Sequence, residues 1–144
     1  MKIKIITGRL GKSIYVNNLV AEMNLKSVSD GLKGSDSTKH AIKVFYPLDH
    51  LILLSLCACL GLSFIKEDYG SIVIEEANSV KESAIRFIVD ELNETVNDSF
   101  ILYLVMQEIP DWILSYGIDV EVIDVYRDFD KQGLTNNNKE EEES

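Results

Sequence analysis

Short alternating segments and short apolar segments dominate the pattern of this 144-residue chain. Apolar and polar side chains alternate over residues 1–16, on either side of the glycine-containing segment 8–12, which predicts a β-hairpin. The same alternation predicts a second hairpin over 64–76. Residues 41–46 and 118–125 have the pattern of single strands, and the second of these has one polar face.

Helical spacing follows the first predicted hairpin. Over residues 18–32 the apolar positions keep a helical period but change phase after Met23, which predicts two short helices joined by a turn at Asn24. Residues 51–65 form the most apolar stretch of the chain. This stretch predicts a buried helix that begins near Pro47 and ends at Gly61, because proline suits a first turn and glycine a C-terminal cap. That stretch is shorter than the roughly 20 apolar residues that cross a bilayer, so we expect no membrane span.

Two more helices are expected in the second half of the chain. Ser79 and Glu82 have the spacing of a capping box at the start of a helix that runs to about residue 92. The segment 100–109 is apolar on nearly all sides, which predicts a helix buried in the core and ended by Pro110.

These elements together predict an α+β fold. We expect a small antiparallel sheet, made of the two hairpins plus a C-terminal strand, to pack against three to four helices. Residues 1–129 would form a single domain. Residues 130–144, rich in asparagine and glutamate, would form a disordered acidic tail.

Charge is distributed unevenly. The chain carries a net charge of -10, but residues 1–46 hold eight Lys and Arg against three Asp and Glu, whereas residues 47–144 hold six against twenty-one. A net-acidic protein is repelled by nucleic acid and by anionic lipid, which disfavours nonspecific binding to either. The two cysteines cannot form a disulfide framework and no secretory signal opens the sequence, so we expect a cytoplasmic location.

The segment Gly8-Arg9-Leu10-Gly11-Lys12-Ser13 resembles the phosphate-binding loop of nucleotide hydrolases. That loop has four residues between its glycines, and this segment has two, so fewer backbone N–H groups are available to surround a phosphate. The β-branched residues Ile14 and Val16 favour a hairpin over a helix start. No strand-ending aspartate is in place to hold magnesium, and a plain turn is the interpretation.

The segment Val28-Ser29-Asp30-Gly31-Leu32-Lys33-Gly34 resembles the end of the recognition helix in helix-turn-helix repressors. The resemblance covers about one-tenth of the chain. Ala21, which would belong to the first helix of the pair, is about three residues closer to Val28 than the family's pattern requires. It implies a DNA-binding surface made of Lys26, Ser27 and Lys33.

No catalytic, metal or cofactor site is predicted. The histidines and cysteines lack the spacing of zinc ligands, and the pairs of acidic residues lie at the ends of the second predicted hairpin, where we expect them to be solvated. An aspartate before a histidine is interpreted as a helix start rather than a general base. The residues concerned are His40, Asp49, His50, Cys57, Cys59, Glu67, Asp68, Glu75 and Glu76.

The C-terminal half combines carboxylates with aromatic side chains, which is typical of a surface for a basic partner. The leading hypothesis is a binding or regulatory protein, such as an inhibitor or immunity-type accessory factor, rather than an enzyme. One alternative is a DNA-binding regulator that uses residues 18–34 and forms a homodimer; another is an enzyme whose site is assembled from distant residues. The predicted partner-binding residues are Trp112, Asp119, Glu121, Asp124, Tyr126, Asp128 and Asp130.

Overall fold

The computed structural model describes residues 1–32, 42–60, 69–96 and 98–126. At its centre is a five-stranded sheet with the strand order β2-β3-β4-β1-β5. All four adjacent pairs of strands run parallel. The strands are β1 (Lys2–Thr7), β2 (Ile42–Phe45), β3 (Ser71–Ile74), β4 (Ile101–Val105) and β5 (Asp119–Asp124).

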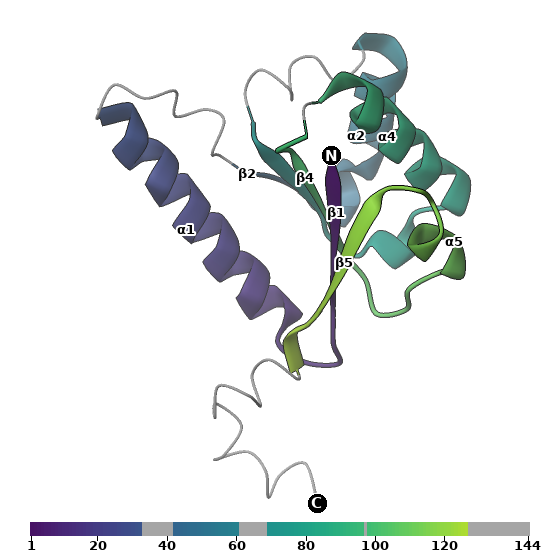
Figure 1. Ribbon diagram of the computed structural model, residues 1–144, viewed down its shortest axis with the longest axis horizontal. Helices are drawn as coiled ribbons and strands as arrows, with labels where there is room; N and C mark the ends of the chain where they lie inside the picture. Colours follow the sequence, from purple (N-terminus) through teal and green to yellow (C-terminus); the bar gives the residue numbers. More distant parts are fainter. Residues whose placement is uncertain (33–41, 61–68, 97, 127–144) are drawn as a thin grey trace, which may run out of the picture.

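Helices connect each strand to the next and cover both faces of the sheet. Figure 1 shows α1 alone on one side of the sheet and the other helices on the opposite side. The protein is therefore an α/β fold, and the predicted α+β fold with an antiparallel sheet is wrong. The helices are α1 (Lys12–Leu32), α2 (His50–Leu60), α4 (Glu82–Thr95) and α5 (Asp111–Leu114), with short 3-10 helices η2 (Pro47–Asp49) and η3 (Ala77–Ser79).

The first predicted hairpin is wrong because its second half is helical. β1 ends at Thr7, a four-residue loop follows, and α1 begins at Lys12. Val16 is buried against the sheet within α1, so packing of one helix face outweighs the strand preference of its β-branched side chain. The second predicted hairpin is wrong as well, because β3 pairs with β2 and β4 rather than with the segment before it, and residues 61–68 lie outside the described part of the chain.

The apolar segment 100–109 contains β4 (Ile101–Val105) instead of the predicted helix. Leu102 and Leu104 are buried in the core on one side of the sheet, and Tyr103 and Val105 in the core on the other side. A central strand of a parallel sheet is covered on both faces, so it has no polar face. A short apolar run of this kind has the same pattern whether it is a buried strand or a buried helix.

The predicted turn at Asn24 is also wrong, because α1 is continuous from Lys12 to Leu32. The Asn24 side chain instead accepts a hydrogen bond of 2.9 Å from the backbone N–H of Ile42, at the start of β2. Ser79 does not cap α4 as predicted, because its hydroxyl donates to the Glu76 carbonyl oxygen within η3 and Lys81 is the N-cap residue.

Several predicted elements are confirmed. The strands expected over 41–46 and 118–125 are β2 and β5, and the apolar helix expected after Pro47 is η2 followed by α2. The predicted burial of that helix is wrong for its first turn, where Leu51 and Ile52 are exposed. None of the described helices combines the length and the apolarity that crossing a bilayer requires.

Candidate functional site

After the neighbouring strands β1 and β4, the chain leaves the sheet on opposite faces. β1 continues into α1 on one face of the sheet, whereas β4 continues toward α5 on the other face. Open parallel sheets bind ligands at this kind of crevice, outside the carboxyl ends of adjacent strands whose connections leave on opposite faces. The fold therefore directs attention to the segments that follow β1 and β4.

The loop after β1 depends on its two glycines. Gly8 has a φ of 132° and Gly11 a φ of 88°, values that L side chains rarely adopt. The Gly11 carbonyl oxygen accepts a 3.0 Å hydrogen bond from the N–H of Tyr15, so Gly11 is the residue from which α1 starts. The first N–H groups of a helix have no acceptor within the helix and carry partial positive charge, which favours an anion at this point.

Lys12 places a charged amino group directly at the helix start. Its Nζ donates hydrogen bonds to the Gly8 carbonyl oxygen and, over 2.7 Å, to Oε1 of Gln107. Gln107 follows β4, so this contact joins the segments after the two central strands across the crevice. The ammonium group is therefore held at the centre of the carboxyl edge of the sheet.

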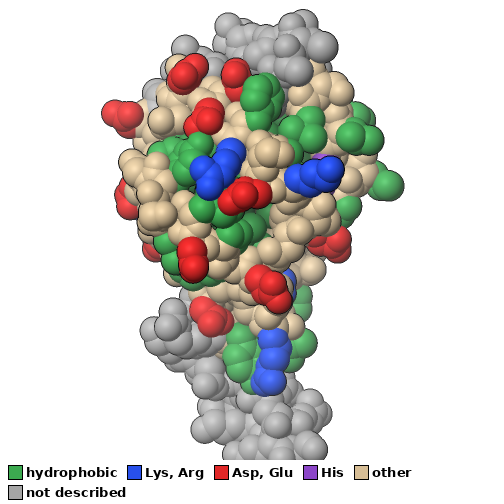
Figure 2. All heavy atoms as spheres, turned by 90° about the vertical axis from the view of Figure 1, so that its right-hand side faces the viewer, with side chains coloured by type: hydrophobic (Ala, Val, Ile, Leu, Met, Phe, Trp, Pro, Cys, Tyr) green, Lys and Arg blue, Asp and Glu red, His purple; other side chains and the backbone are tan. Residues whose placement is uncertain are grey.

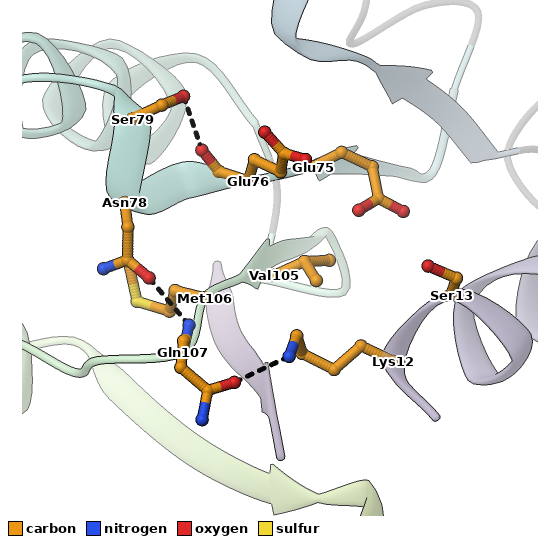
Figure 3. A pocket seen from close by; sticks show the side chains of 9 residues that line it. All are labelled: Lys12, Ser13, Glu75, Glu76, Asn78, Ser79, Val105, Met106 and Gln107. Atoms are coloured by element: carbon orange, nitrogen blue, oxygen red, sulfur yellow. Dashed lines mark hydrogen bonds between the residues drawn. The ribbon is translucent and has the colours of Figure 1, made fainter. Parts of the chain in front are cut away.

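Two carboxylates follow β3, the strand beyond β4. In Figure 3 the carboxylate of Glu75 points into the cavity on the side of Ser13, whereas that of Glu76 points the other way. Burial raises the pKa of the Glu75 carboxyl, the neighbouring charge of Glu76 raises it further, and the Lys12 ammonium lowers it. Lys12 and Glu75 line the same cavity, so a cation and a carboxylate face one site.

Asn78 connects the segment after β3 to the segment after β4. Its Oδ1 accepts hydrogen bonds from the backbone N–H groups of Gln107, over 2.7 Å, and Glu108, over 3.2 Å. Its Nδ2 donates to the Glu108 carbonyl oxygen over 2.7 Å. The chain reaches this position through Glu76, whose backbone has the left-handed conformation, with φ 49° and ψ 50°. A non-glycine residue in this conformation costs free energy, and such sparsely populated conformations cluster at functional sites.

These residues surround a cavity of about 440 Å³ at the carboxyl edge of the sheet. Cavities that hold small ligands have volumes of about 300–1,000 Å³. One cation, two carboxylates and four uncharged polar side chains lie around it, together with two apolar side chains from β4 and its extension (Figure 3). The lining residues are Lys12, Ser13, Glu75, Glu76, Asn78, Ser79, Val105, Met106 and Gln107.

Within the described ranges, no three His, Cys, Asp or Glu side chains come together as a metal site. Cys57 and Cys59 lie in α2, and the His50 ring nitrogen Nε2 lies 3.0 Å from the Glu75 carbonyl oxygen. His40, Glu67 and Asp68 lie outside the described residues. A site into which one carboxylate points, that of Glu75, fits Mg²⁺ that arrives with phosphate groups, because Mg²⁺ is usually held by one or two carboxylates together with phosphate oxygens.

The predicted acidic partner-binding residues lie in different places. Asp119 and Glu121, near the start of β5, form cross-strand ion pairs with lysines of β1: Lys2 Nζ lies 3.7 Å from Asp119 and 4.0 Å from Glu121, and Lys4 Nζ lies 3.7 Å from Glu121. The lysines therefore offset part of the negative charge on this strand.

The other members of the predicted set lie elsewhere. Trp112 packs under Arg86, at 4.5 Å from the guanidinium carbon to the ring centroid, whereas Asp124 and Tyr126 lie at the far end of β5. Figure 2 shows the face that carries α4 and α5, where acidic side chains are scattered among basic and apolar ones. Asp128 and Asp130 lie outside the described residues, and binding of a basic protein through this set stays a prediction.

The predicted DNA-binding residues do not lie on a second helix. Lys26 is exposed on α1, Ser27 belongs to the same continuous helix, and Lys33 lies outside the described residues. A single helix therefore replaces the two-helix arrangement expected over this part of the chain, up to Leu32.

Sequence reasoning missed Gln107 and Asn78 and interpreted Glu75 and Glu76 as solvated ends of a hairpin. One signal was present: Ile72, Val73 and Ile74 form a β-branched run that leads directly into the two carboxylates. A run of that kind is typical of a buried parallel strand, after which side chains reach the ligand edge of a sheet. Gln107 and Asn78 have no such signal, because only the pairing of β3, β4 and β1 brings them together.

Comparison with known proteins identifies no relative: no family model, no curated protein and no solved structure matches this chain.

Proposed function

We propose that this protein binds the triphosphate chain of a nucleotide, together with its Mg²⁺ ion, at the carboxyl edge of the sheet. The observation that carries the proposal is the position of Lys12: it begins the helix after β1 and lies across a 440 Å³ cavity from a carboxylate that follows β3. A lysine at the start of the helix after a glycine-containing loop is the arrangement with which phosphate-loop proteins bind β- and γ-phosphates.

Each side chain has a chemical role in this proposal. Lys12 and the N–H groups of the first turn of α1 would bind the phosphate oxygens. The Ser13 hydroxyl and the Glu75 carboxylate, which lie toward the same side of the cavity in Figure 3, would contact the Mg²⁺ ion that accompanies the phosphates. Gln107 would contact the phosphate end nearest β4, once Lys12 turns from its Oε1 toward the ligand.

The shorter loop changes the expected affinity rather than the place of binding. Only Arg9 and Leu10 lie between Gly8 and Gly11, so the loop offers fewer N–H groups than a loop with four intervening residues. A larger share of the binding free energy must then come from Lys12 and from Mg²⁺. We therefore expect a strong dependence on both.

Isothermal titration calorimetry of the purified chain with ATP, with and without Mg²⁺, tests the proposal. We expect binding that requires Mg²⁺ and that Lys12→Ala weakens at least 10-fold, about 1.4 kcal/mol. Lys26→Ala is the matched control, because it removes the same charge from an exposed position farther along α1. Circular dichroism of each variant establishes that the fold is kept.

A second pair of variants tests the carboxylate. Glu75→Gln should remove most of the effect of Mg²⁺ on the affinity, whereas Glu22→Gln, at an exposed position of α1, should leave it unchanged. The proposal is wrong if the native chain does not bind ATP at about 1 mM with Mg²⁺ present, or if Lys12→Ala and Lys26→Ala bind equally well.

A further inference from the structure

Arg9 and Tyr126 form an ordered pair beside the loop. The guanidinium carbon of Arg9 lies 4.8 Å from the centroid of the Tyr126 ring, and its Nη2 donates a 3.0 Å hydrogen bond to the Tyr126 hydroxyl. Arg9 is exposed and Tyr126 is half-buried. The guanidinium group therefore lies over the tyrosine ring, and the arginine side chain is accessible from solvent.

This pair is attached closely to the loop that carries Lys12. A Cβ atom on Gly8 would lie 3.1 Å from the backbone nitrogen of Tyr126 and 3.1 Å from Cγ2 of Val125, so the loop and the end of β5 pack backbone to backbone. Val125 is itself buried. Figure 1 shows the start of α1 and the end of β5 meeting at the same edge of the sheet.

The side chains along this edge follow a fixed spatial order. Glu75 follows β3, Gln107 follows β4, Lys12 follows β1, and Tyr126 follows β5, and the sheet order places these four strands side by side. At about 4.8 Å between neighbouring strands, the carboxylate end and the aromatic end are about 14 Å apart. Metal-binding, phosphate-binding and aromatic chemistry thus occur in the order in which a nucleotide presents Mg²⁺, phosphates and base.

We propose that Arg9 and Tyr126 form a stacking platform for the nucleobase of the nucleotide. This inference rests on the proposed triphosphate site and identifies its ligand as a whole nucleotide rather than a polyphosphate. The base would stack on the guanidinium plane that faces away from Tyr126, as arginine planes stack on bases in nucleic-acid complexes. Stacking uses the π-face that every base has, so the platform selects for a base without selecting strongly among bases.

A comparison of two ligands tests the platform separately from the phosphate site. Binding of ATP and of inorganic tripolyphosphate, each with Mg²⁺, is measured by calorimetry on the full chain. Both ligands carry three phosphates, but only ATP has a base. We expect the native protein to bind ATP about 10-fold more tightly than tripolyphosphate, which is the size of one base stack.

Variants of the pair should remove that preference. Tyr126→Ala and Arg9→Lys should each lower the affinity for ATP about 10-fold and leave that for tripolyphosphate unchanged, because Arg9→Lys keeps the charge and loses the plane. Tyr126→Phe keeps the ring and should keep the preference. Tyr46→Ala, which removes an exposed tyrosine next to β2, is the matched control and should change neither affinity.

Three results would overturn the platform. Equal affinities of the native protein for ATP and tripolyphosphate would leave the triphosphate site in place and exclude a base contact. Equal losses for both ligands in Tyr126→Ala and Arg9→Lys would mean that the pair only holds the shape of the loop. If neither ligand binds the native protein, the proposed function fails and the platform fails with it.

Discussion

Lys12 at the start of α1 donates a 2.7 Å hydrogen bond from Nζ to Oε1 of Gln107, the second residue after β4. This contact crosses between the two central strands at their carboxyl ends. It places the cation of the proposed phosphate site in contact with an uncharged acceptor, and a ligand must compete with that acceptor for the ammonium group.

Replacing the acceptor with a carboxylate should close the site to phosphates. In Gln107→Glu the new carboxylate would pair with Lys12 and repel the phosphate groups, so we expect the affinity for ATP with Mg²⁺ to fall at least 10-fold. Gln107→Met keeps the length of the side chain and adds no charge, so it should lose only the amide contact with the phosphates and weaken binding a few-fold, less than Gln107→Glu does. Calorimetry measures both, and equal affinities of the two variants would contradict the competition.

Asn78 should act as a positioning residue for Gln107. Asn78→Ala removes the three hydrogen bonds to the backbone of Gln107 and Glu108. Because these bonds are near the surface, we expect a loss of about 1 kcal/mol in the free energy of unfolding, together with a several-fold loss of ATP affinity. Asn93→Ala, at an exposed position of α4, is the control for both measurements. A stability loss without an affinity loss would limit Asn78 to a structural role.

The stability of the protein should depend on pH through Glu75. The pKa of this carboxyl is raised in the folded state, first by burial and then by the charge of Glu76, so the folded state holds its proton more tightly than the unfolded state. The stabilisation is then fully present below the unfolded pKa of about 4.5 and is lost as the pH rises through the folded pKa.

Glu75→Gln should remove this pH dependence. The variant should be more stable than the native protein at pH 7, and the difference should shrink toward pH 4. Because Glu75 is partly exposed, screening by solvent keeps the difference below about 1 kcal/mol. Urea unfolding at a series of pH values measures this difference in stability. If the native protein instead gains stability relative to Glu75→Gln as the pH rises, the prediction is wrong.

The loop after β1 should tolerate no side chain at Gly8. Gly8→Ala combines a φ of 132° with contacts of 3.1 Å to the end of β5, whereas Gly117→Ala combines a φ of 88° with open space. We expect about 1 kcal/mol of destabilisation for Gly117→Ala from strain alone, and at least about 1 kcal/mol more for Gly8→Ala. Denaturant unfolding of the two variants checks the order, and equal losses would show that the contact with β5 relaxes freely.

Because β4 is the central strand of the sheet, its buried side chains should contribute strongly to the free energy of unfolding. Leu104 is fully buried, whereas Leu51 on α2 is 76% exposed. Leu104→Ala should lower the free energy of unfolding by about 2–5 kcal/mol, and Leu51→Ala should change it by less than about 0.5 kcal/mol. Urea denaturation of both variants measures the difference. A loss below 1 kcal/mol for Leu104→Ala would be inconsistent with a strand that is covered on both faces.

The sequence alone determined those elements whose hydrophobic pattern is compatible with only one kind of secondary structure. β5 alternates apolar and polar residues, and α2 begins after a proline, so both were predicted near their observed positions. It also contained the chemistry of the site, because Gly11-Lys12-Ser13 and Glu75-Glu76 are visible as motifs. What those motifs do together was not visible, since Lys12 and Glu75 are 63 residues apart in the chain.

Only the tertiary structure decided which strands are neighbours and which way they run. Strands pair through backbone hydrogen bonds, which nearly every residue can form. The choice of neighbouring strands therefore depends on how the helices pack on the two faces of the sheet. The segment 100–109 contains a strand rather than a helix because helices cover it on both faces of the sheet. The second half of the first predicted hairpin is part of α1 because Val16 packs on the sheet. The same pairing placed β5 beside β1 and thus Tyr126 beside Arg9, a contact over 117 residues that no local pattern contains.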